Sequence, residues 1–520
     1  MNWRKNASLF PAHYSKEHFM KKMAIMPALV TLLALSACAP GPKYTKPVVS
    51  TPAKFHEDLS DKAGVSDLKT WWKQFNDPVL DGLIDQSVSA NYDLLRATQR
   101  IDEARAMLGR ERANYGPTGN MTGSYTKSSQ SLTNRGTKHQ LEPNKPVPVR
   151  IERRSHIYDA GFDANWELDV FGRVRKRAEA AKADLQALEE DRRFVLITLI
   201  GDVGRNYIEL RGAQELFALT VKNLHTQEET LKLTRARFEA GLNTELDVSR
   251  SEAQVATTEA QIPGYREQID LSIHRLSVLA GKEPGALFAE LDQPAPMPVL
   301  PPATFAGLPS ALLERRPDIR SAERNLAAQT ARIGAAKADY FPRFILTGNW
   351  GLSASDLENM DRYDSQHYSF GPRIEWPILD AWRTKYNVKA ARSREEQARA
   401  DYHQTILLAF EEVENSLVTL QQQLNRGRIL DRAVVANRRA VELAHELQSN
   451  GLVDFLSVLD TERELLASES ARAQSQIDAT SNMVTLYKSL GGGWETFEPL
   501  EDGKPASAAP VSTKPTASTP

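Results

Sequence analysis

The sequence predicts a mainly α-helical chain with a small β part, assembled from two copies of one structural unit. The first observation behind this prediction is an internal repeat that covers most of the 520 residues. The second is a change of hydrophobic period inside each copy, from about 3.5 residues, typical of coiled-coil helices, to two residues, typical of strands. Each copy is therefore expected to contain a long helical hairpin and a pair of amphipathic strands.

The repeat is visible as residue identities at fixed offsets. An offset of 210 relates Trp166 to Trp376, Arg173 to Arg383 and Gly241 to Gly451, whereas an offset of 225 relates Asp93 to Asp318 and Tyr115 to Tyr340. The difference places 15 extra residues in the first copy, between Tyr125 and Arg153. Two copies of one unit are therefore present, residues 91–290 and 308–490, with a Pro-rich linker at 291–307.

The N-terminus reads as an export signal. Lys21 and Lys22 precede the apolar run Met23–Leu35, which is too short as a helix to cross the hydrocarbon core of about 30 Å. The following Leu-Ser-Ala-Cys resembles a bacterial lipobox, so residues 1–37 are expected to be removed and Cys38 to be lipidated. A buried free cysteine is the alternative.

Residues 38–90 are expected to form a lipidated tether and a short segment before the first copy. The stretch Ala39–Thr51 is rich in Pro and Gly, which predicts extended backbone without a packed core. At the other end, Gly491 stops the last helical pattern, and residues 491–520 are expected to form a disordered tail.

In the first copy, a helix free of Pro is predicted over Arg173–Ala240. Gly241 provides the turn, and Thr244 caps a helix that returns antiparallel over Glu245–Leu279. The second copy repeats this order with a helix over Thr384–Asn450. Its turn is Gly451, and its return helix is capped by Asp454 and runs to Leu490. On the helices alone, a scaffold coiled coil remains an alternative.

Each copy also contains two segments in which apolar and polar residues alternate. They are Thr118–Tyr125, Ile157–Leu168, Arg343–Leu352 and Tyr368–Ile378. Their aromatic residues are expected at a membrane interface: Tyr158, Phe162, Trp166, Tyr368, Phe370 and Trp376. Half-buried strands of a β-sandwich alternate in the same way.

Four strands cannot close a barrel, and open strand edges are not tolerated in lipid. Several chains must therefore share one barrel if these strands span a membrane. Three copies would supply 12 strands, enough for an open lumen because about 8 strands are just filled by side chains.

Composition excludes several other classes. One Cys rules out a disulfide framework, a net charge of −2 gives no electrostatic case for nucleic acid, and the ten His are scattered without metal-ligand spacing. No phosphate-binding loop or nucleophile constellation is present, and Ser66 with Lys69 matches only a chance tetrapeptide. We therefore expect no enzyme, no cofactor and no metal.

Several motifs at this point carry a family resemblance. They are Gly41-Pro42 with Tyr44, Trp71-Trp72 with Phe75, Asp77-Pro78, Trp166 to Arg173 (WELDVFGR), Arg316-Pro317-Asp318-Ile319, Phe341-Pro342, Leu346-Thr347-Gly348, and Gly451 with Phe455-Leu456 and Asp460. The chain resembles the outer-membrane factor family of tripartite efflux systems, the TolC-like channels, and specifically its NodT-type lipoprotein branch. The resemblance covers nearly all of residues 38–493.

This resemblance implies a homotrimer with a 12-stranded β-barrel in the outer membrane and a long α-helical barrel in the periplasm. It also implies a periplasmic adaptor and an inner-membrane pump as partners, and export of drugs or other toxic small molecules. In the family an Asp and an Arg one turn apart, with a nearby Leu, gate the periplasmic tip. The matching residues here are Asp460, Arg463 and Leu456.

Asp247 and Arg250 have the same spacing near the first tip and rank second as gate residues. Asp460 with Arg463 could equally be a solvated intrahelical pair. Two other classes stay open: a periplasmic adaptor lipoprotein, which carries one helical hairpin between compact β modules, and a structural scaffold of the cell envelope.

Overall fold

The computed structural model describes residues 40–56, 68–129, 131, 154–301 and 309–497. The chain divides into two compact units. Unit 1 comprises Met1–Pro47, Asp102–Gln186 and Glu323–Asp401, and unit 2 comprises Val48–Ile101, Ala187–Ala322 and Tyr402–Pro520. Each unit takes segments from both copies of the repeat.

The order of elements is the same in the two copies, which confirms the predicted repeat. The first copy contains α3 (Tyr92–Ala113), β1 (Thr118–Ser129), β2 (Arg154–Leu168), α4 (Arg173–Glu239), α5 (Glu245–Glu259) and α6 (Ile262–Leu279). The second contains α9 (Pro317–Ala338), β3 (Arg343–Ala354), β4 (Gln366–Glu375), α10 (Ala381–Ser449) and α11 (Phe455–Ser489). The shorter helices are α2 (Pro78–Ala90), α7 (Phe288–Leu291) and α8 (Pro309–Arg315), with 3-10 turns at Trp71–Phe75, Leu357–Asn359, Tyr363–Ser365, Ile378–Asp380 and Glu495–Phe497.

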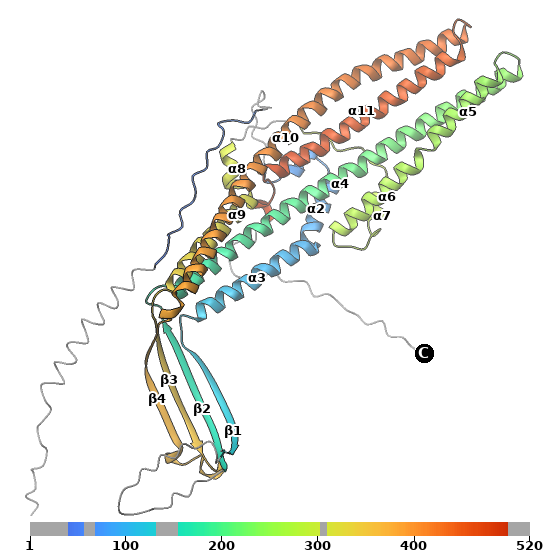
Figure 1. Cartoon of the computed structure of the whole chain (residues 1–520). Coiled ribbons are helices and arrows are strands. Elements are labelled where there is room, and N and C mark those ends of the chain that lie inside the picture. The colour runs from blue at the N-terminus through green and yellow to red at the C-terminus, as the bar shows by residue number, and fades with distance from the viewer. Residues whose placement is uncertain (1–39, 57–67, 130, 132–153, 302–308, 498–520) are drawn as a thin grey trace, which may run out of the picture. The chain divides into compact units, whose positions relative to one another are not determined.

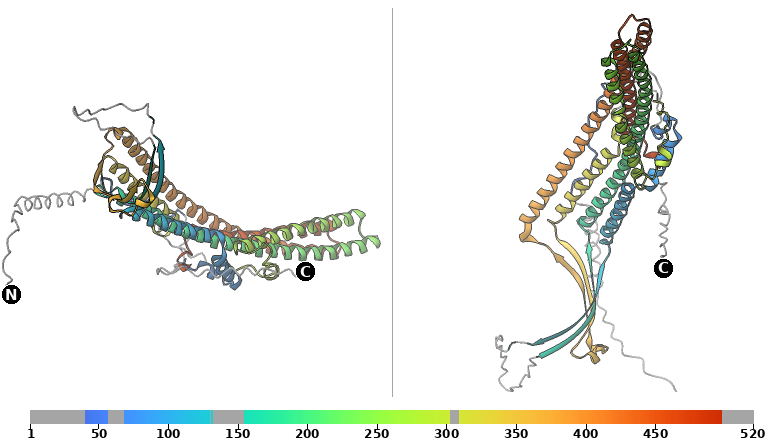
Figure 2. Two further views of the ribbon diagram at one scale, coloured as in Figure 1. Left: turned by 90° about the horizontal axis from the view of Figure 1, so that it is seen from below. Right: turned by 90° about the vertical axis from the view of Figure 1, so that its right-hand side faces the viewer.

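Within unit 1 the four strands form one antiparallel sheet in the order β1-β2-β3-β4 (Figure 1). Figure 2 shows these strands twisting around one another, as strands of L-residues do. The two hairpins predicted from the sequence are therefore neighbours in one sheet, in which β2 of the first hairpin pairs with β3 of the second.

The last strand ends earlier than the alternation suggested. β4 stops at Glu375, so Trp376 lies just beyond it, and Ile378 belongs to a 3-10 turn. Pro377 explains the difference, because it has no backbone N–H to donate to a strand ladder. The 15 extra residues of the first copy lie largely outside the described residues, which omit 130 and 132–153.

The return helix of the first copy spans the predicted range but is interrupted, whereas a single helix was expected. It consists of α5 and α6, which are separated at Ala260 and Gln261. Pro263 causes the break: a proline ring clashes with the preceding helical turn and is tolerated only in the first turn of a helix, where it lies in α6. In the second copy, without such a proline, α11 is continuous over Phe455–Ser489.

The two long hairpins of unit 2 turn with the same backbone geometry. Gly241 (φ 75°) and Gly451 (φ 71°) are left-handed, and in each turn two backbone N–H groups close a Schellman motif onto the last helical carbonyls. Thr244 caps α5 in a capping box, and Asp454 caps α11. Both turns lie at the same end of unit 2 (Figures 1 and 2), so they form its tip.

The core of unit 2 forms around an aromatic cluster that precedes the first copy. Trp71, Trp72 and Phe75 are fully buried, and Trp71 stacks on Tyr487 of α11. The start of the predicted disordered tail also belongs to this core, which corrects that prediction for residues 491–497. Trp494 is buried and Phe497 stacks on Trp72, because the aromatic cluster offers these rings an apolar surface.

The N-terminal tether has no regular secondary structure, as predicted, but it is packed. In unit 1 the ring of Tyr44 lies against Ala183, Ala327 and Ala328, and its hydroxyl donates to Glu323. A Cβ at Gly41 would come within 2.6 Å of Gly334 Cα on α9, so only glycine permits this approach. The expectation of a tether without packing is therefore wrong for this part.

Candidate functional site

One register divides the sheet into an apolar face and a polar face. Directly opposed residues share a face, and Met121, Phe162, Trp350 and Tyr368 form one such row across all four strands. The same face carries Tyr158, Trp166, Leu346 and Phe370. Phe162, Tyr368 and Phe370 are at least half exposed in the single chain. A face of this kind requires an apolar environment such as lipid.

Two tryptophans occupy equivalent places in the copies. The indole nitrogen of Trp166 donates to the carbonyl oxygen of Tyr115 at 2.8 Å, and that of Trp376 donates to Tyr340 at 3.1 Å. Each indole thus ties the end of a hairpin to the segment that enters it. An indole with a satisfied polar end and an exposed apolar ring suits a membrane–water interface.

The opposite face is polar. It presents Asp159 and Asp163 from β2, Asn349 from β3, and Ser369 and Arg373 from β4. Asn120 of β1 donates to the Asp163 carboxylate at 3.3 Å. Alternation of this kind in every strand is what a water-filled barrel requires.

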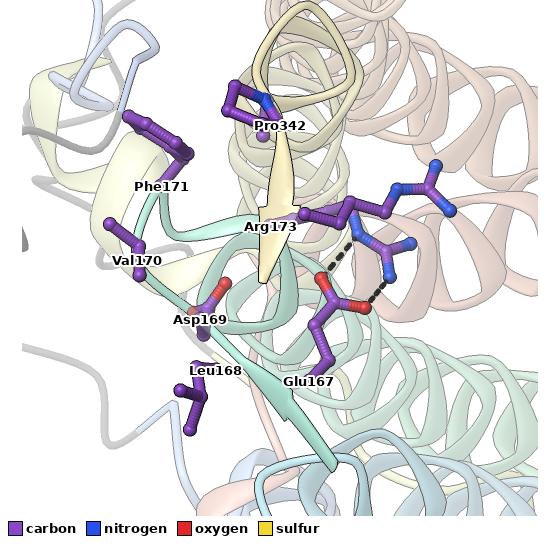
Figure 3. A pocket seen from close by; sticks show the side chains of 9 residues that line it. Glu167, Leu168, Asp169, Val170, Phe171, Arg173 and Pro342 are labelled. Atoms are coloured by element: carbon purple, nitrogen blue, oxygen red, sulfur yellow. Dashed lines mark hydrogen bonds and ion pairs between the residues drawn. The ribbon is translucent and has the colours of Figure 1, made fainter. Parts of the chain in front are cut away.

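The corner where β2 enters α4 contains a small hollow, shown in Figure 3. The Glu167 carboxylate there accepts two hydrogen bonds from Arg173, and Asp169 accepts from the backbone N–H groups of Val174 and Arg175, both at 2.9 Å. Although burial opposes its charge, the bond to Glu167 raises the pKa of Arg173. The polar groups of this hollow bind each other, so it serves as a rigid corner.

The tip of unit 2 holds the residues that match the family's gate. Asp460 and Arg463 on α11 form an ion pair of 3.8 Å, with both side chains at least half exposed. Arg463 also donates to Oε1 of Gln254 on α5 at 2.5 Å, which joins the two hairpins. Leu456 is half-buried one turn earlier on α11.

Asp247 and Arg250 are not brought together in the same way. Asp247 accepts from the backbone and hydroxyl of Thr244, so its carboxylate caps α5. Arg250 instead acts on the second hairpin. Hydrogen bonds from Ser457 lower the pKa of the Asp454 carboxyl, and the positive charge of Arg250 lowers it further. Asp247 with Arg250 and Asp460 with Arg463 therefore have the same spacing in sequence but different partners in the structure.

Sequence reasoning missed Gln254 and a pair of residues beside the proposed gate, in which the carboxylate is buried and the imidazole is about half exposed. Glu462 of α11 is buried and accepts from His445 of α10 and Thr230 of α4. In the sequence, Glu462 corresponds to Glu252 of the first copy at the offset of 210. Comparing the residues that face these two glutamates across each hairpin would have pointed to His445.

Among the described residues, no cluster of three or more His, Cys, Asp or Glu is arranged to hold a metal ion. None of the described helices combines the length and hydrophobicity needed to cross a membrane. Cys38 lies outside the described residues.

Comparison with known proteins identifies the family. The model of the family described as outer membrane efflux protein matches residues 83–282 and 308–492, which together form most of the chain. The chain belongs to the outer membrane efflux protein family. Nodulation protein T of Rhizobium leguminosarum bv. trifolii is 31% identical over 462 residues, which cover 89% of this chain and 96% of the relative.

Two further relatives agree with this assignment. The solvent efflux pump outer membrane protein SrpC of Pseudomonas putida is 33% identical over 483 residues, covering 90% of this chain and 98% of SrpC. The solved structure of the outer-membrane channel OprN superposes with a TM-score of 0.79 at 35% identity, covering 88% of this chain and all of that chain.

The outer membrane efflux fold confirms the predicted fold class. Three chains with four strands each form one 12-stranded β-barrel, continued by a barrel of long helices. The protein is an outer-membrane channel of an efflux pump, and it extends into the periplasm. The apolar face of the sheet therefore faces lipid and its polar face lines the lumen.

Proposed function

We propose that the channel is the passive outer-membrane conduit of a tripartite machine that exports drugs or other toxic small molecules. The observation that carries the proposal is the single register that gives all four strands one apolar and one polar face. Such a wall conducts solutes but supplies no energy. The role is transport without catalysis, with the driving force coming from partner proteins.

The proposed gate is formed by Leu456, Asp460 and Arg463 at the tip. The Asp460–Arg463 pair stays on one helix, whereas the Arg463–Gln254 hydrogen bond of 2.5 Å joins α11 to α5. Breaking the Arg463–Gln254 bond removes roughly 0.5–1.5 kcal/mol per protomer that holds the hairpins together. Asp247 and Arg250 are secondary candidates, because Asp247 is occupied in capping.

A planar-bilayer recording on the purified trimer tests this proposal. We expect low conductance from the wild type and an increase of at least about tenfold for Asp460→Ala with Arg463→Ala, the factor that corresponds to about 1.4 kcal/mol. Asp247→Ala with Arg250→Ala is the matched control at the first hairpin and should raise conductance less. Equal increases in the two double variants would contradict the assignment, and no channels in any variant would overturn the conduit itself.

The proposed partners are a periplasmic adaptor and an inner-membrane pump. Leu242 and Leu452, each next to a tip glycine, are exposed to about 70% and 71%. Exposed leucines at the ends of two adjacent hairpins offer an apolar contact for such an adaptor. Leu242→Asp with Leu452→Asp should abolish co-purification of the adaptor while leaving the trimer intact.

We also propose that Cys38 carries the lipid, which would hold the N-terminal arm at the outer membrane. The packing of Tyr44 against α9 supports this, since it fixes the arm on unit 1 a few residues after the cysteine. Cys38→Ser should eliminate incorporation of radiolabelled palmitate. Labelling that persists in this variant would contradict the proposal, because Cys38 is the one cysteine of the sequence and the variant has no thiol to carry the lipid.

A further inference from the structure

Next to the proposed gate lies a buried carboxylate with an incomplete set of partners. Glu462 on α11 is only 8% exposed. Its Oε1 atom lies 3.0 Å from Nε2 of His445 on α10 and accepts a hydrogen bond of 3.3 Å from the Thr230 hydroxyl on α4. Its Oε2 atom is buried and has no hydrogen-bond partner in the described part of the chain. The carboxylate therefore joins three helices from both copies.

The repeat supplies an internal comparison for this contact. At the offset of 210, Glu462 corresponds to Glu252 and His445 corresponds to Arg235. Arg235 and Glu252 also form an interhelical ion pair, with a distance of 2.6 Å and both side chains about half exposed. The same place in the hairpin thus holds a permanent cation in the first copy and an imidazole in the second.

This difference changes how the two pairs respond to pH. A guanidinium stays charged at all physiological pH values, whereas imidazole is the side chain that changes charge between about pH 5 and 8. Burial raises the pKa of Glu462, and the nearby His445 and Thr230 oppose that shift. A buried carboxylate that loses its cation becomes costly.

Several other charged groups around the pair have partners of their own. On α10, Glu442 pairs with Arg439, and Arg438 pairs with Glu469 of α11. On α11, Arg463 binds Asp460 and Gln254. On α4, the exposed His225 and Glu229 face each other at 3.9 Å one turn before Thr230. Glu446 follows His445 on α10 and is exposed.

We propose that His445 and Glu462 form a pH-sensitive restraint that holds the tip of the channel closed in acid and releases it as the pH rises. The inference rests on the proposed gate at Asp460 and Arg463, which flank Glu462 on the same helix. When His445 is protonated, imidazolium neutralises the carboxylate, and Glu462 can hold α10, α11 and α4 together. When His445 is neutral, the carboxylate lacks a counter-charge, and the contact that joins α10, α11 and α4 weakens.

The test is a pH series of planar-bilayer recordings between pH 5.5 and 8.5. The wild-type trimer should increase its open probability at least about fivefold over this range, the lower end of typical coupling between sites. His445→Arg should abolish the step and stay at the low, acid level. His445→Gln should also abolish it but stay at the high level, so the two variants bracket the wild type. His225→Gln on α4 is the matched control, and it should keep the full step because that pair is exposed.

A second measurement separates this inference from the gate. Hydrogen–deuterium exchange of residues 440–466, compared between wild type and His445→Arg at each pH, reports the restraint without reference to conductance. If exchange is identical in the two proteins at every pH, the inference is overturned whatever the gate does. If exchange differs between wild type and His445→Arg as the pH rises, but Asp460→Ala with Arg463→Ala fails to open the channel, the gate assignment fails and the restraint stands. If that double variant opens but the wild-type pore shows no pH step, the gating role of His445 is overturned.

Discussion

Gly241 and Gly281 end helices in the same left-handed conformation, but their surroundings differ. Their φ angles are 75° and 70°. A Cβ at Gly241 would meet nothing within 4 Å, whereas one at Gly281 would lie 2.4 Å from the carbonyl oxygen of Ala90. We expect Gly241→Ala to lower the free energy of unfolding by about 1–2 kcal/mol, the cost of left-handed backbone alone.

Gly281→Ala should cost clearly more, since the backbone at the end of α2 must move as well. Denaturant unfolding of detergent-solubilised protein, followed by circular dichroism, compares the two variants. Equal losses would show that the contact with Ala90 relaxes freely and would contradict this expectation.

At the scale of single residues, local signals were predictable and distant contacts were not. Gly451 and Asp454 were foreseen because a turn and a helix cap depend only on neighbouring residues. The bond between Gln254 and Arg463 joins residues 209 positions apart, so no local pattern reveals it. The proposed gate residues Asp460 and Arg463 came from the family resemblance, and their spacing alone also fits a solvated pair.

The segment after α11 packs as an element of unit 2. Trp494 is 9% exposed, with the guanidinium groups of Arg193 and Arg320 at 4.7 and 5.5 Å from its ring centroid. Both arginines also bind Glu190, each at 2.6 Å. Trp494→Ala should therefore destabilise the protein by about 3–5 kcal/mol, as truncation of a buried aromatic ring does.

Thr496→Val provides the matched control for Trp494→Ala. Its hydroxyl makes one exposed hydrogen bond of 2.7 Å to the carbonyl of Lys69, so its loss should cost only about 0.5–1.5 kcal/mol. Thermal unfolding of the purified trimer compares the two variants. A small effect of Trp494→Ala, no larger than that of the control, would mean that residues 491–497 do not stabilise unit 2.

At the scale of elements, periodicity predicted the helices and strands, while prolines decided where they end. Pro263 divides the first return helix and Pro377 lies just beyond the last strand, and the periodic patterns run through both positions. The packing of residues 491–497 was hidden for a different reason. These residues pack on the aromatic cluster of Trp71 and Trp72, which lies more than 400 positions earlier in the sequence. The composition of the C-terminal segment, rich in small residues and proline, gives no sign of this contact.

The alternation of the strands makes the most direct prediction for the assembled channel. Phe162 and Asp163 are neighbours on β2, but Phe162 lies in the apolar row with Trp350, and Asp163 lies on the polar face. In a barrel of three chains, the first points to lipid and the second to the water of the lumen. We expect a charged, membrane-impermeant maleimide to label Asp163→Cys at least about tenfold faster than Phe162→Cys, since a thiolate reacts and lipid suppresses its formation.

Both variants are made in the Cys38→Ser chain, so that each protein has one thiol and both lack the proposed lipid equally. Trp350→Cys and Asn349→Cys repeat the comparison on β3, where the register places Trp350 beside Phe162 and Asn349 beside Asp163. In a β-sandwich, the apolar face would also be protected from the reagent, but by a second sheet rather than by lipid. Solubilising the trimer in a short-chain detergent therefore distinguishes the two cases: labelling of the apolar positions should rise only if lipid had shielded them. Unchanged protection would contradict a lipid-facing row and with it the shared barrel.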